Sequence, residues 1–258
     1  MKLAFRKFGT GQALIILHGL FGSSDNWQTF GKKLAEHFAV YLVDLRNHGH
    51  SPHNEEWNYE VMSDDLAELI SDENIQHPIV IGHSMGGKAA MYFAITHPDK
   101  VKKLVVLDIS PKFYPIHHQP ILTALQAVDL NKITSRKQAE EIISEFISDI
   151  STKQFLLKNL YWSENEPKKL AWRFNLEVIA KNINEVGAET PFPEKPIDTF
   201  QTLFIRGEKS NYISESDIEL VKKYFFGAEI KTIIDAGHWI HADQPQQLYD
   251  VLMEFILR

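Results

Sequence analysis

The sequence predicts an α/β fold: a mostly parallel sheet covered by helices on both faces, with a helical lid inserted into it. Short apolar runs alternate with helix-like segments over most of the chain, as they do when helices join parallel strands. The alternation stops between Phe113 and Pro196, where the sequence is helix-like and lacks comparable strand runs. With 258 residues, 44% of them hydrophobic, the chain is long enough for one large domain with a well-covered core.

The strands are predicted from short β-rich apolar runs, each followed by a polar or glycine-containing turn. These runs are Ala13–Leu17, Ala39–Val43, Ile79–Ile81, Leu104–Leu107, Thr202–Ile205 and Glu229–Ile234. The helical patterns between or after them are Trp27–His37, Tyr59–Asp72, Gly87–His97, Ser214–Phe225 and Gln246–Leu257. Ligand sites in such sheets lie at the carboxyl ends of the strands.

The lid is predicted over residues 113–196, which leaves residues 1–112 and 197–258 as the core. Its helix-like segments are Gln119–Val128, Ser135–Ile150, Thr152–Leu160 and Lys168–Asn182. A group of helices inserted into an α/β alternation is expected to pack over the strand ends. We expect most of its aromatic side chains to form the lid's own core.

Charge and composition exclude several classes of protein. The net charge of −7 and the scattered lysines argue against a nucleic-acid partner, because binding to phosphates requires a concentrated basic face. The chain contains no cysteine, which excludes disulfides, thiolate metal sites and a cysteine nucleophile. No apolar run approaches the roughly 18 residues that span a bilayer, and the N-terminal stretch lacks the apolar segment of a secretion signal. We therefore expect a cytoplasmic protein without a membrane span.

Residues 79–94 have the pattern of a nucleophile elbow, in which a strand, a glycine-flanked serine and a helix follow one another. The strand run leads into Gly-His-Ser-Met-Gly at residues 82–86, with Ser84 at the centre. Glycine two residues to either side leaves room for the strand and the helix to pass closely. The serine would lie at a helix N-terminus, which favours developing negative charge. An ordinary glycine-rich turn is the alternative unless the chain also supplies a base, an acid and an oxyanion hole.

The first predicted strand ends in His-Gly-Leu-Phe-Gly at residues 18–22, where an oxyanion-hole amide is expected. The main-chain amides of Leu20 and Met85 would bind the oxyanion of a tetrahedral intermediate, with the amide of Phe21 as second choice to that of Leu20. We assign His18 a structural role in hydrogen bonding nearby loops, because the general base is expected late in the chain.

His238 is the candidate base, because it follows the last strand-like run and so lies in a loop at the carboxyl end of a strand. His48, His50 and His53 lack a supporting carboxylate pattern or the helical spacing of a metal site. We interpret them as solvated loop histidines, and the pair at residues 117–118 in the same way. No metal site is predicted.

The acid has candidates after two neighbouring strands. Asp108 follows the run Leu104–Leu107, whereas Glu208 and Ser210 follow the next strand along the chain. A carboxylate is needed to hold the imidazole tautomer and to stabilise the imidazolium, and serine cannot supply that charge. We favour Asp108, keep Glu208 as the alternative, and expect Ser210 to hydrogen-bond the pair of Asp108 and His238.

Taken together, the motifs resemble the α/β-hydrolase superfamily and, within it, the bacterial YbfF-type esterases. The matching segments are residues 18–22, 44–49 (Asp-Leu-Arg-Asn-His-Gly), 82–88, 107–111 (Leu-Asp-Ile-Ser-Pro) and 237–241 (Gly-His-Trp-Ile-His). Many superfamily members carry the acid after the strand that follows the lid, where this chain has Ser210. The resemblance to the YbfF-type subgroup implies that Asp108 is the acid. It covers both flanks of the lid and is less clear within it.

The expected activity is that of a serine hydrolase that cleaves carboxylic esters or acyl thioesters through an acyl-enzyme. Ser84 would attack, His238 would transfer its proton, and Asp108 would orient His238. The substrate is expected to be a small molecule, and no metal or organic cofactor is implied. The side chains expected to contact the substrate are Phe155, Trp162 and Trp239. The alternatives are carbon–carbon bond hydrolysis or perhydrolysis on the same fold, and a slow-turnover small-molecule sensor.

Overall fold

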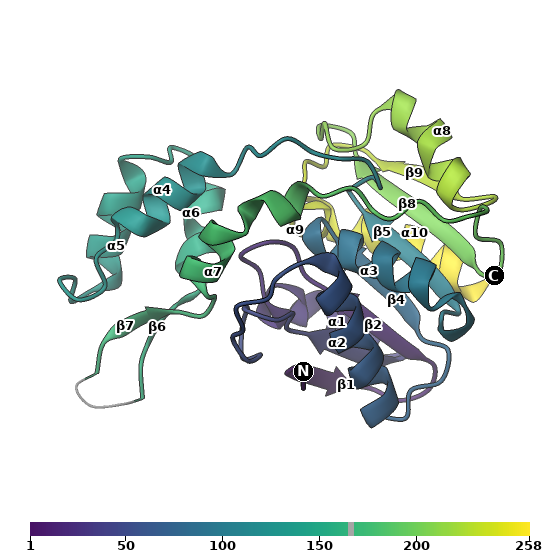
Figure 1. Ribbon diagram of the computed structural model, residues 1–258, viewed down its shortest axis with the longest axis horizontal. Coiled ribbons are helices and arrows are strands. Elements are labelled where there is room, and N and C mark those ends of the chain that lie inside the picture. Colours follow the sequence, from purple (N-terminus) through teal and green to yellow (C-terminus); the bar gives the residue numbers. More distant parts are fainter. Residues whose placement is uncertain (165–167) are drawn as a thin grey trace.

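The computed structural model describes residues 1–164 and 168–258, and it confirms the predicted α/β fold (Figure 1). The central sheet has seven strands in the order β1-β3-β2-β4-β5-β8-β9. The strands are β1 (Phe5–Phe8), β2 (Ala13–Leu17), β3 (Ala39–Val43), β4 (Ile79–His83), β5 (Lys103–Leu107), β8 (Gln201–Gly207) and β9 (Glu229–Ile233). All neighbours run parallel except β1, which is antiparallel to β3. The register sets His83 opposite Leu107, so the residues that follow, Ser84 and Asp108, emerge side by side.

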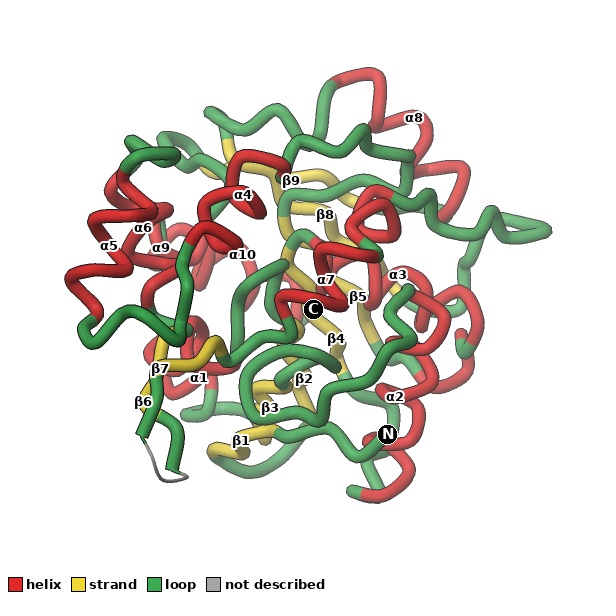
Figure 2. The backbone as a smooth tube through the Cα atoms, turned by 60° about the vertical axis from the view of Figure 1, so that its left-hand side comes forward, coloured by secondary structure: helices red, strands yellow, loops and turns green. Residues whose placement is uncertain are grey.

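Helices cover both faces of the sheet (Figure 2). One face carries α2 (Tyr59–Asp72), α3 (Met85–Thr96) and α8 (Glu215–Tyr224), and the other carries α1 (Gln28–Leu34) and α10 (Pro245–Leu257). The short helices η1 (Ser24–Trp27), η2 (Pro98–Lys100) and α9 (Ile240–Asp243) lie in the connections. The two layers create two apolar cores, one on each side of the sheet.

The helix α2 shows how local sequence sets these elements. It begins after Asn58, whose side chain accepts a hydrogen bond of 3.0 Å from the amide of Val61 and so caps the first turn. Its apolar side chains recur at helical spacing and are buried against the sheet: Met62, Leu66, Leu69 and Ile70. The helix is therefore amphipathic: most of its charged residues are exposed, whereas Asp65 is buried and paired with Arg46 at 2.6 Å.

The central strands are buried on both faces, as the continuous apolar runs predict. Every residue of β2, β3, β4 and β5 is buried. Along β2, Ile15 and Leu17 pack with α2 and α3, whereas Leu14 and Ile16 pack with α1 and α10. Successive side chains of a strand point to opposite faces, so one apolar strand contributes to both cores.

Between β5 and β8 the chain leaves the sheet and forms a group of elements at the left of Figure 1. These are α4 (Gln119–Ala127), α5 (Arg136–Ser144), α6 (Ile150–Leu157), β6 (Leu160–Trp162), β7 (Leu170–Trp172), α7 (Leu176–Lys181) and η3 (Ile183–Gly187). The helices pack on one another through fully buried side chains such as Leu125, Ile143 and Ile179. We call residues 113–196 the cap.

The cap contains a short hairpin where helix was predicted. Strands β6 and β7 pair antiparallel, with Leu160 opposite Trp172. The helices predicted at 152–160 and 168–182 are therefore wrong in part, because α6 ends at Leu157 and α7 covers only Leu176–Lys181. Strands of three residues are too short to show a period of two in their sequence. They form because β6 and β7 pair with each other.

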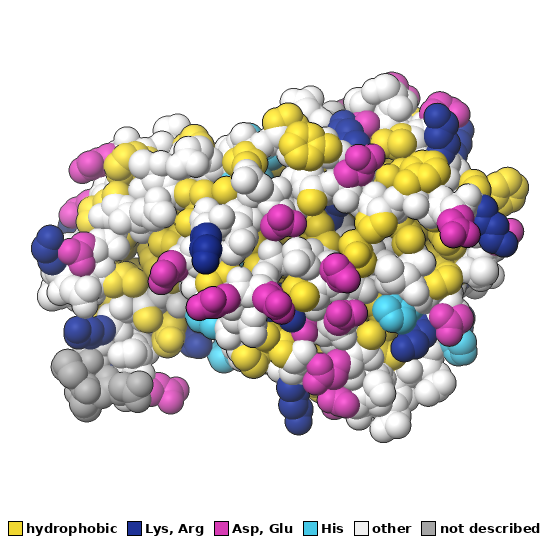
Figure 3. Space-filling view, in the orientation of Figure 1, with side chains coloured by type: hydrophobic (Ala, Val, Ile, Leu, Met, Phe, Trp, Pro, Cys, Tyr) yellow, Lys and Arg dark blue, Asp and Glu magenta, His cyan; other side chains and the backbone are white. Residues whose placement is uncertain are grey.

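No helix within the described part of the chain combines the length and the apolar character needed to cross a bilayer. On the face shown in Figure 3, Lys and Arg side chains are interspersed with Asp and Glu side chains. That face is not the concentrated basic surface that binding to phosphates requires.

Candidate active site

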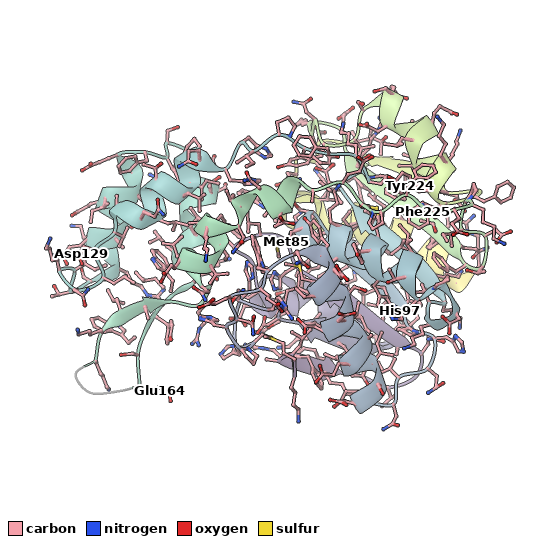
Figure 4. The ribbon with its side chains drawn as sticks, viewed as in Figure 1. Met85, His97, Asp129, Glu164, Tyr224 and Phe225 are labelled. Carbon is pink, nitrogen blue, oxygen red and sulfur yellow. The ribbon has the colours of Figure 1, made fainter. Side chains whose placement is uncertain are left out.

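Ser84 occupies the sharp turn between β4 and α3. Its backbone angles of φ 53° and ψ −118° lie in a region that is costly for a residue with a side chain. The turn is held by the Ser84 amide, which donates to the carbonyl of Leu107 on β5 at 3.0 Å. Met85 then begins α3, at the end of that helix nearest the cap (Figure 4). Ser84 therefore precedes a helix whose first amides have no partner within the helix.

Glycines on both sides of Ser84 allow β4, α3 and β2 to pass at close range. A Cβ atom on Gly82 would lie 2.2 Å from the carbonyl oxygen of Gly86. A Cβ atom on Gly86 would lie 2.5 Å from the carbonyl oxygens of Leu17 and His18 at the end of β2. Both separations are far shorter than a normal contact between heavy atoms. An ordinary glycine-rich turn does not require such close contacts between backbone segments.

Asp108 and His238 form a hydrogen-bonded pair beside this turn. Asp108 follows β5, is fully buried, and has a φ of 51°. His238 follows β9, and its Nδ1 lies 2.7 Å from Oδ2 of Asp108. The second carboxylate oxygen accepts from the amide of Gly207 at 3.1 Å. A buried carboxylate needs such partners, and here they also fix the direction in which it faces His238.

The side chain of Ser210 lies on the same carboxylate, as expected from the sequence. Its hydroxyl donates to Oδ2 of Asp108, and its Oγ accepts from the amide of Tyr212 at 3.3 Å. Glu208, the alternative acid, is exposed and accepts from the amide of Asp235 at 2.9 Å. The structure thus brings Asp108, and not Glu208, to the imidazole.

Two further contacts hold His238, one on its ring and one on its main-chain carbonyl. Its ring stacks on Tyr212, with centroids 4.0 Å apart and an interplanar angle of 18°. The main-chain carbonyl of His238 lies 2.8 Å from Nε2 of His83. A carbonyl can only accept, so Nε2 of His83 is the donor. Burial keeps the pKa of His83 well below its usual value, so this ring is neutral. Sequence reasoning did not single out His83 or Tyr212, because neither belongs to a pattern with a chemical role.

His18 has the structural role expected for it. Its Nε2 accepts from the amide of Leu45 at 3.0 Å, which leaves Nδ1 to donate to the carbonyl of Gly19 at 2.8 Å. Burial lowers the pKa of His18, and the neutral form is the one that this pair of contacts requires. The ring therefore joins the loop after β2 to the loop after β3.

His48 corrects one prediction, because it is completely buried and not solvated. Its Nε2 lies 3.2 Å from the amide nitrogen of Phe21, and its Nδ1 lies 3.0 Å from the carbonyl of Arg46. The carbonyl requires Nδ1 to carry the hydrogen, so Nε2 accepts from Phe21. Burial lowers the pKa of His48 to about 3. His50 and His53 are exposed, as predicted.

The contact with His48 distinguishes the two candidate amides of the oxyanion loop, residues 18–22. The amide of Phe21 is already bound to an imidazole. Within residues 1–164 and 168–258, the amides of Leu20 and Met85 donate to no other group. Leu20 is thus favoured over Phe21 as the partner of Met85.

Ser84 and His238 line one cavity of about 230 Å³ between the sheet and the cap. The oxyanion loop forms one wall, and Phe155 and Leu156 of α6 form another. The rings of Phe155 and Trp239 lie 5.3 Å apart, so cap and core meet in an apolar surface. Both were expected to contact substrate.

Trp162 does not join that surface. It lies on β6, is 47% exposed, and is absent from the lining of this cavity within the described residues. The physical reason is the hairpin: β6 and β7 carry the chain away from α6 toward solvent (Figure 1). The prediction for Trp162 is therefore corrected.

Comparison with known proteins identifies the fold family. The family described as "alpha/beta hydrolase fold" matches residues 12–245. The chain belongs to this family.

Individual relatives of this α/β hydrolase cover nearly its whole length. The Danio rerio protein named sn-1-specific diacylglycerol lipase ABHD11 is 38% identical over 259 residues, which cover 96% of this chain and 79% of that protein. Esterase YbfF of Escherichia coli is 33% identical over 244 residues, or 94% and 92% of the two chains. A solved structure of a "Marine microorganism esterase" has 42% identity and a TM-score of 0.95 over 99% of each chain. The resemblance to YbfF-type esterases is confirmed.

One wall of the hydrolase cavity is polar. Nε2 of His117 and the hydroxyl of Tyr212 lie 2.6 Å apart, and His118 stands beside them. Burial raises the pKa of Tyr212 to about 12 and lowers that of His118 to about 4, so both side chains are neutral at pH 7. His118 is half-buried in the cavity wall, which corrects the prediction of a solvated side chain, whereas His117 is exposed as predicted. The cavity therefore offers apolar surface on one side and neutral hydrogen-bonding groups on the other.

Proposed function

We propose that this protein is a serine hydrolase that cleaves carboxylic esters with Ser84, His238 and Asp108 as its catalytic triad. The observation that carries the proposal is the hydrogen bond between His238 and the buried carboxylate of Asp108, in a cavity that Ser84 also lines. A carboxylate on Nδ1 leaves Nε2 of the imidazole as the atom that can accept a proton from a hydroxyl. The family and the names of the relatives support an ester as the substrate.

The reaction follows from these positions. Oγ of Ser84 attacks the acyl carbon while Nε2 of His238 takes the hydroxyl proton. The carbonyl π electrons move to oxygen, which gives a tetrahedral oxyanion. The C–O bond to the alcohol then breaks, and His238 returns its proton to the departing oxygen. Water repeats the sequence on the acyl-enzyme, and the carboxylic acid and the free Ser84 are released.

The main-chain amides of Leu20 and Met85 are proposed to bind the oxyanion. Met85 is the first residue of α3, where unpaired amides and the helix dipole stabilise negative charge. The amide of Phe21 donates to His48 in this structure, so it is a weaker candidate. Two preorganised donors directed at the developing charge are a large source of rate enhancement in acyl transfer.

The cavity supports an ester with an apolar acyl group. Phe155, Leu156 and Trp239 supply the apolar wall, and the cap that carries two of them is proposed to act as the lid. Burial of each methylene against such a wall contributes about 0.8 kcal/mol to binding. Acyl thioesters have the same reacting carbonyl and are the second substrate class that this mechanism admits.

A substrate panel tests the proposal. Hydrolysis rates are measured for p-nitrophenyl esters and acyl-CoA thioesters of increasing chain length, with Ser84→Ala as the control. We expect wild-type hydrolysis that rises with chain length until the cavity is filled, and none above background in Ser84→Ala. Activity that survives in Ser84→Ala contradicts the proposal. If the protein instead only hydrolyses carbon–carbon bonds or only forms peracids, the alternative chemistries are favoured.

A further inference from the structure

Phe21, in the oxyanion loop, is held by buried side chains at both of its main-chain polar groups. Its amide donates to Nε2 of His48 in the core at 3.2 Å. Its carbonyl accepts from Nδ2 of Asn159 in the cap at 2.8 Å. Phe21 has a φ of 57°, a conformation that a bulky residue adopts only when its surroundings hold it there.

Asn159 is itself fixed within the cap. It is 5% exposed and follows the end of α6, where its amide donates to the carbonyl of Leu156 at 3.0 Å. Its carbonyl accepts from the amide of Arg173, just beyond β7, at 2.9 Å. Its Nδ2 also lies 3.3 Å from the carbonyls of Phe155 and Leu156. One carboxamide thus joins the cavity-lining helix to the oxyanion loop.

The contact bears directly on the geometry of the oxyanion hole. The loop is a tight turn closed by the amide of Gly22, which donates to the carbonyl of Gly19 at 2.9 Å. Leu20 lies inside this turn, and the carbonyl of Leu20 and the amide of Phe21 belong to one peptide plane. Hydrogen bonds at both the amide and the carbonyl of Phe21 restrict the turn, and the conformation of the turn sets the direction of the Leu20 amide. Oxyanion stabilisation depends on donors that are aimed before the reaction begins.

We propose that Asn159 is a positioning residue through which the cap holds the oxyanion hole in its active geometry. The inference rests on the proposed function, in which the Leu20 amide binds the oxyanion. Asn159 acts through Phe21 and does not itself touch the reacting atoms. The cap is then a part of the catalytic machinery as well as the wall of the substrate cavity.

The central test uses two substitutions of Asn159 and one matched control. Asn159→Leu keeps the approximate volume and removes the donor, and Asn159→Asp keeps the shape and turns an acceptor toward the carbonyl of Phe21. Asn182→Leu is the control, because Nδ2 of Asn182 donates to the carbonyl of Val178 at 2.9 Å within the cap. We expect kcat to fall 10- to 100-fold in both Asn159 variants, with KM within about twofold of wild type. This fall in kcat is smaller than the fall caused by deleting an oxyanion donor. The control should retain wild-type kcat.

Other outcomes overturn the inference. A wild-type kcat in the Asn159 variants, or a raised KM with unchanged kcat, would show that Asn159 only shapes the cavity or secures the cap. Failure of the proposed function is a separate result: absence of ester hydrolysis by the wild-type protein, or hydrolysis by Ser84→Ala.

A measurement on the wild-type protein applies even if the variants do not fold. An alkylboronic acid forms a tetrahedral adduct on a serine nucleophile and mimics the intermediate. In a crystal structure of that adduct, we expect a boronate oxygen to accept from the Leu20 amide while Asn159 remains bonded to Phe21. An adduct in which the carbonyl of Phe21 has left Asn159 would refute the inference.

Discussion

Nδ1 of His238 and Oδ2 of Asp108 lie 2.7 Å apart, although 130 residues of sequence separate them. The sheet accounts for their proximity. Asp108 follows β5 and His238 follows β9, and β8 lies between these strands with all three parallel. Loops at one edge of a parallel sheet converge, so residues from distant parts of the chain form one site. The cap, inserted between β5 and β8, does not disturb this register.

Replacement of Asp108 tests the acid. In Asp108→Asn the amide can donate to Nδ1 of His238, which stabilises the wrong tautomer and leaves the imidazolium without a counter-charge. We expect kcat/KM for a p-nitrophenyl ester to fall on the order of 10⁴-fold. Glu208→Gln is the control and should stay within about twofold of wild type, because Glu208 bonds the amide of Asp235. A larger loss in Glu208→Gln than in Asp108→Asn would reverse the assignment.

Ser210→Ala tests the hydroxyl on the same carboxylate. Asp108 would lose one donor but keep the Gly207 amide and His238. A hydrogen bond to a charged group contributes roughly 1.5–3 kcal/mol, so we expect kcat/KM to fall by roughly 10- to 150-fold. Ser214→Ala is the matched control, because that hydroxyl donates to the carboxylate of Asp217 at 2.7 Å outside the cavity. Equal effects in the two variants would show that Ser210 has no special link to the triad.

The sequence predicted the parts of the site that lie at strand ends. The runs before Ser84 and Asp108 are continuously apolar, and their residues are buried on both faces. Asp108 was favoured because a carboxylate must hold the imidazole tautomer, which Ser210 cannot do, and because the resemblance to YbfF-type esterases implies it. These inferences are local or topological, and both are encoded in short stretches of sequence.

The remaining contacts depend on partners far away in the chain. His48 was predicted to be solvated, yet it is buried, and its ring accepts from the amide of Phe21, 27 residues away. Asn159 lies 138 residues from Phe21, in a part of the cap where the helix prediction was wrong. A polar residue in a loop carries no periodic signal that reports such a partner.

Five histidines make the fold sensitive to acid. Burial lowers the pKa of each: His18, His48, His83, His118 and His241. Since an unfolded histidine titrates near 6.5, the unfolded chain binds more protons than the folded chain below that pH. The contribution of these neutral histidines to the free energy of unfolding is fully present above pH 6.5, and it is lost as the pH falls below 6.5. At pH 5.5 we expect a loss of roughly 1 kcal/mol for each of His48, His118 and His241, whose pKa values are lowered to about 3 or 4. Urea unfolding at pH 7.5 and 5.5 would measure this loss.

The substitution His241→Phe tests the contribution of one of these histidines to the pH dependence of stability. The ring of His241 stacks on Trp27 at 4.1 Å, and its buried Nδ1 has no hydrogen-bond partner within the described residues. Phenylalanine preserves the stacking and cannot be protonated. We expect the slope of unfolding free energy against pH between 6 and 4.5 to decrease by about 1.4 kcal/mol per pH unit. An unchanged slope would mean that His241 is not protonated on unfolding.

Lys88 is expected to secure both ends of the cap. Its buried ammonium donates to the carbonyl of Pro111 at 3.0 Å and of Ala188 at 2.8 Å, which lie on the two connections to the core. Lys88→Met leaves these acceptors without a partner, so we expect a loss of about 2 kcal/mol in stability and faster chymotrypsin cleavage after the exposed Phe113. Lys103→Met is the matched control, because Lys103 donates to carbonyls of α10 far from the cap. Equal cleavage rates at Phe113 in both variants would contradict this role.

Labelling of the nucleophile is the most direct test of the proposed mechanism. The wild-type protein is treated with a fluorophosphonate probe, and the modified residue is located by mass spectrometry alongside Ser84→Ala and Asp108→Asn. We predict one phosphonyl adduct on Ser84, a much slower reaction in Asp108→Asn, and no adduct in Ser84→Ala. An adduct on another residue, or labelling of Ser84→Ala as strong as that of the wild type, would contradict the assignment of Ser84 as the nucleophile.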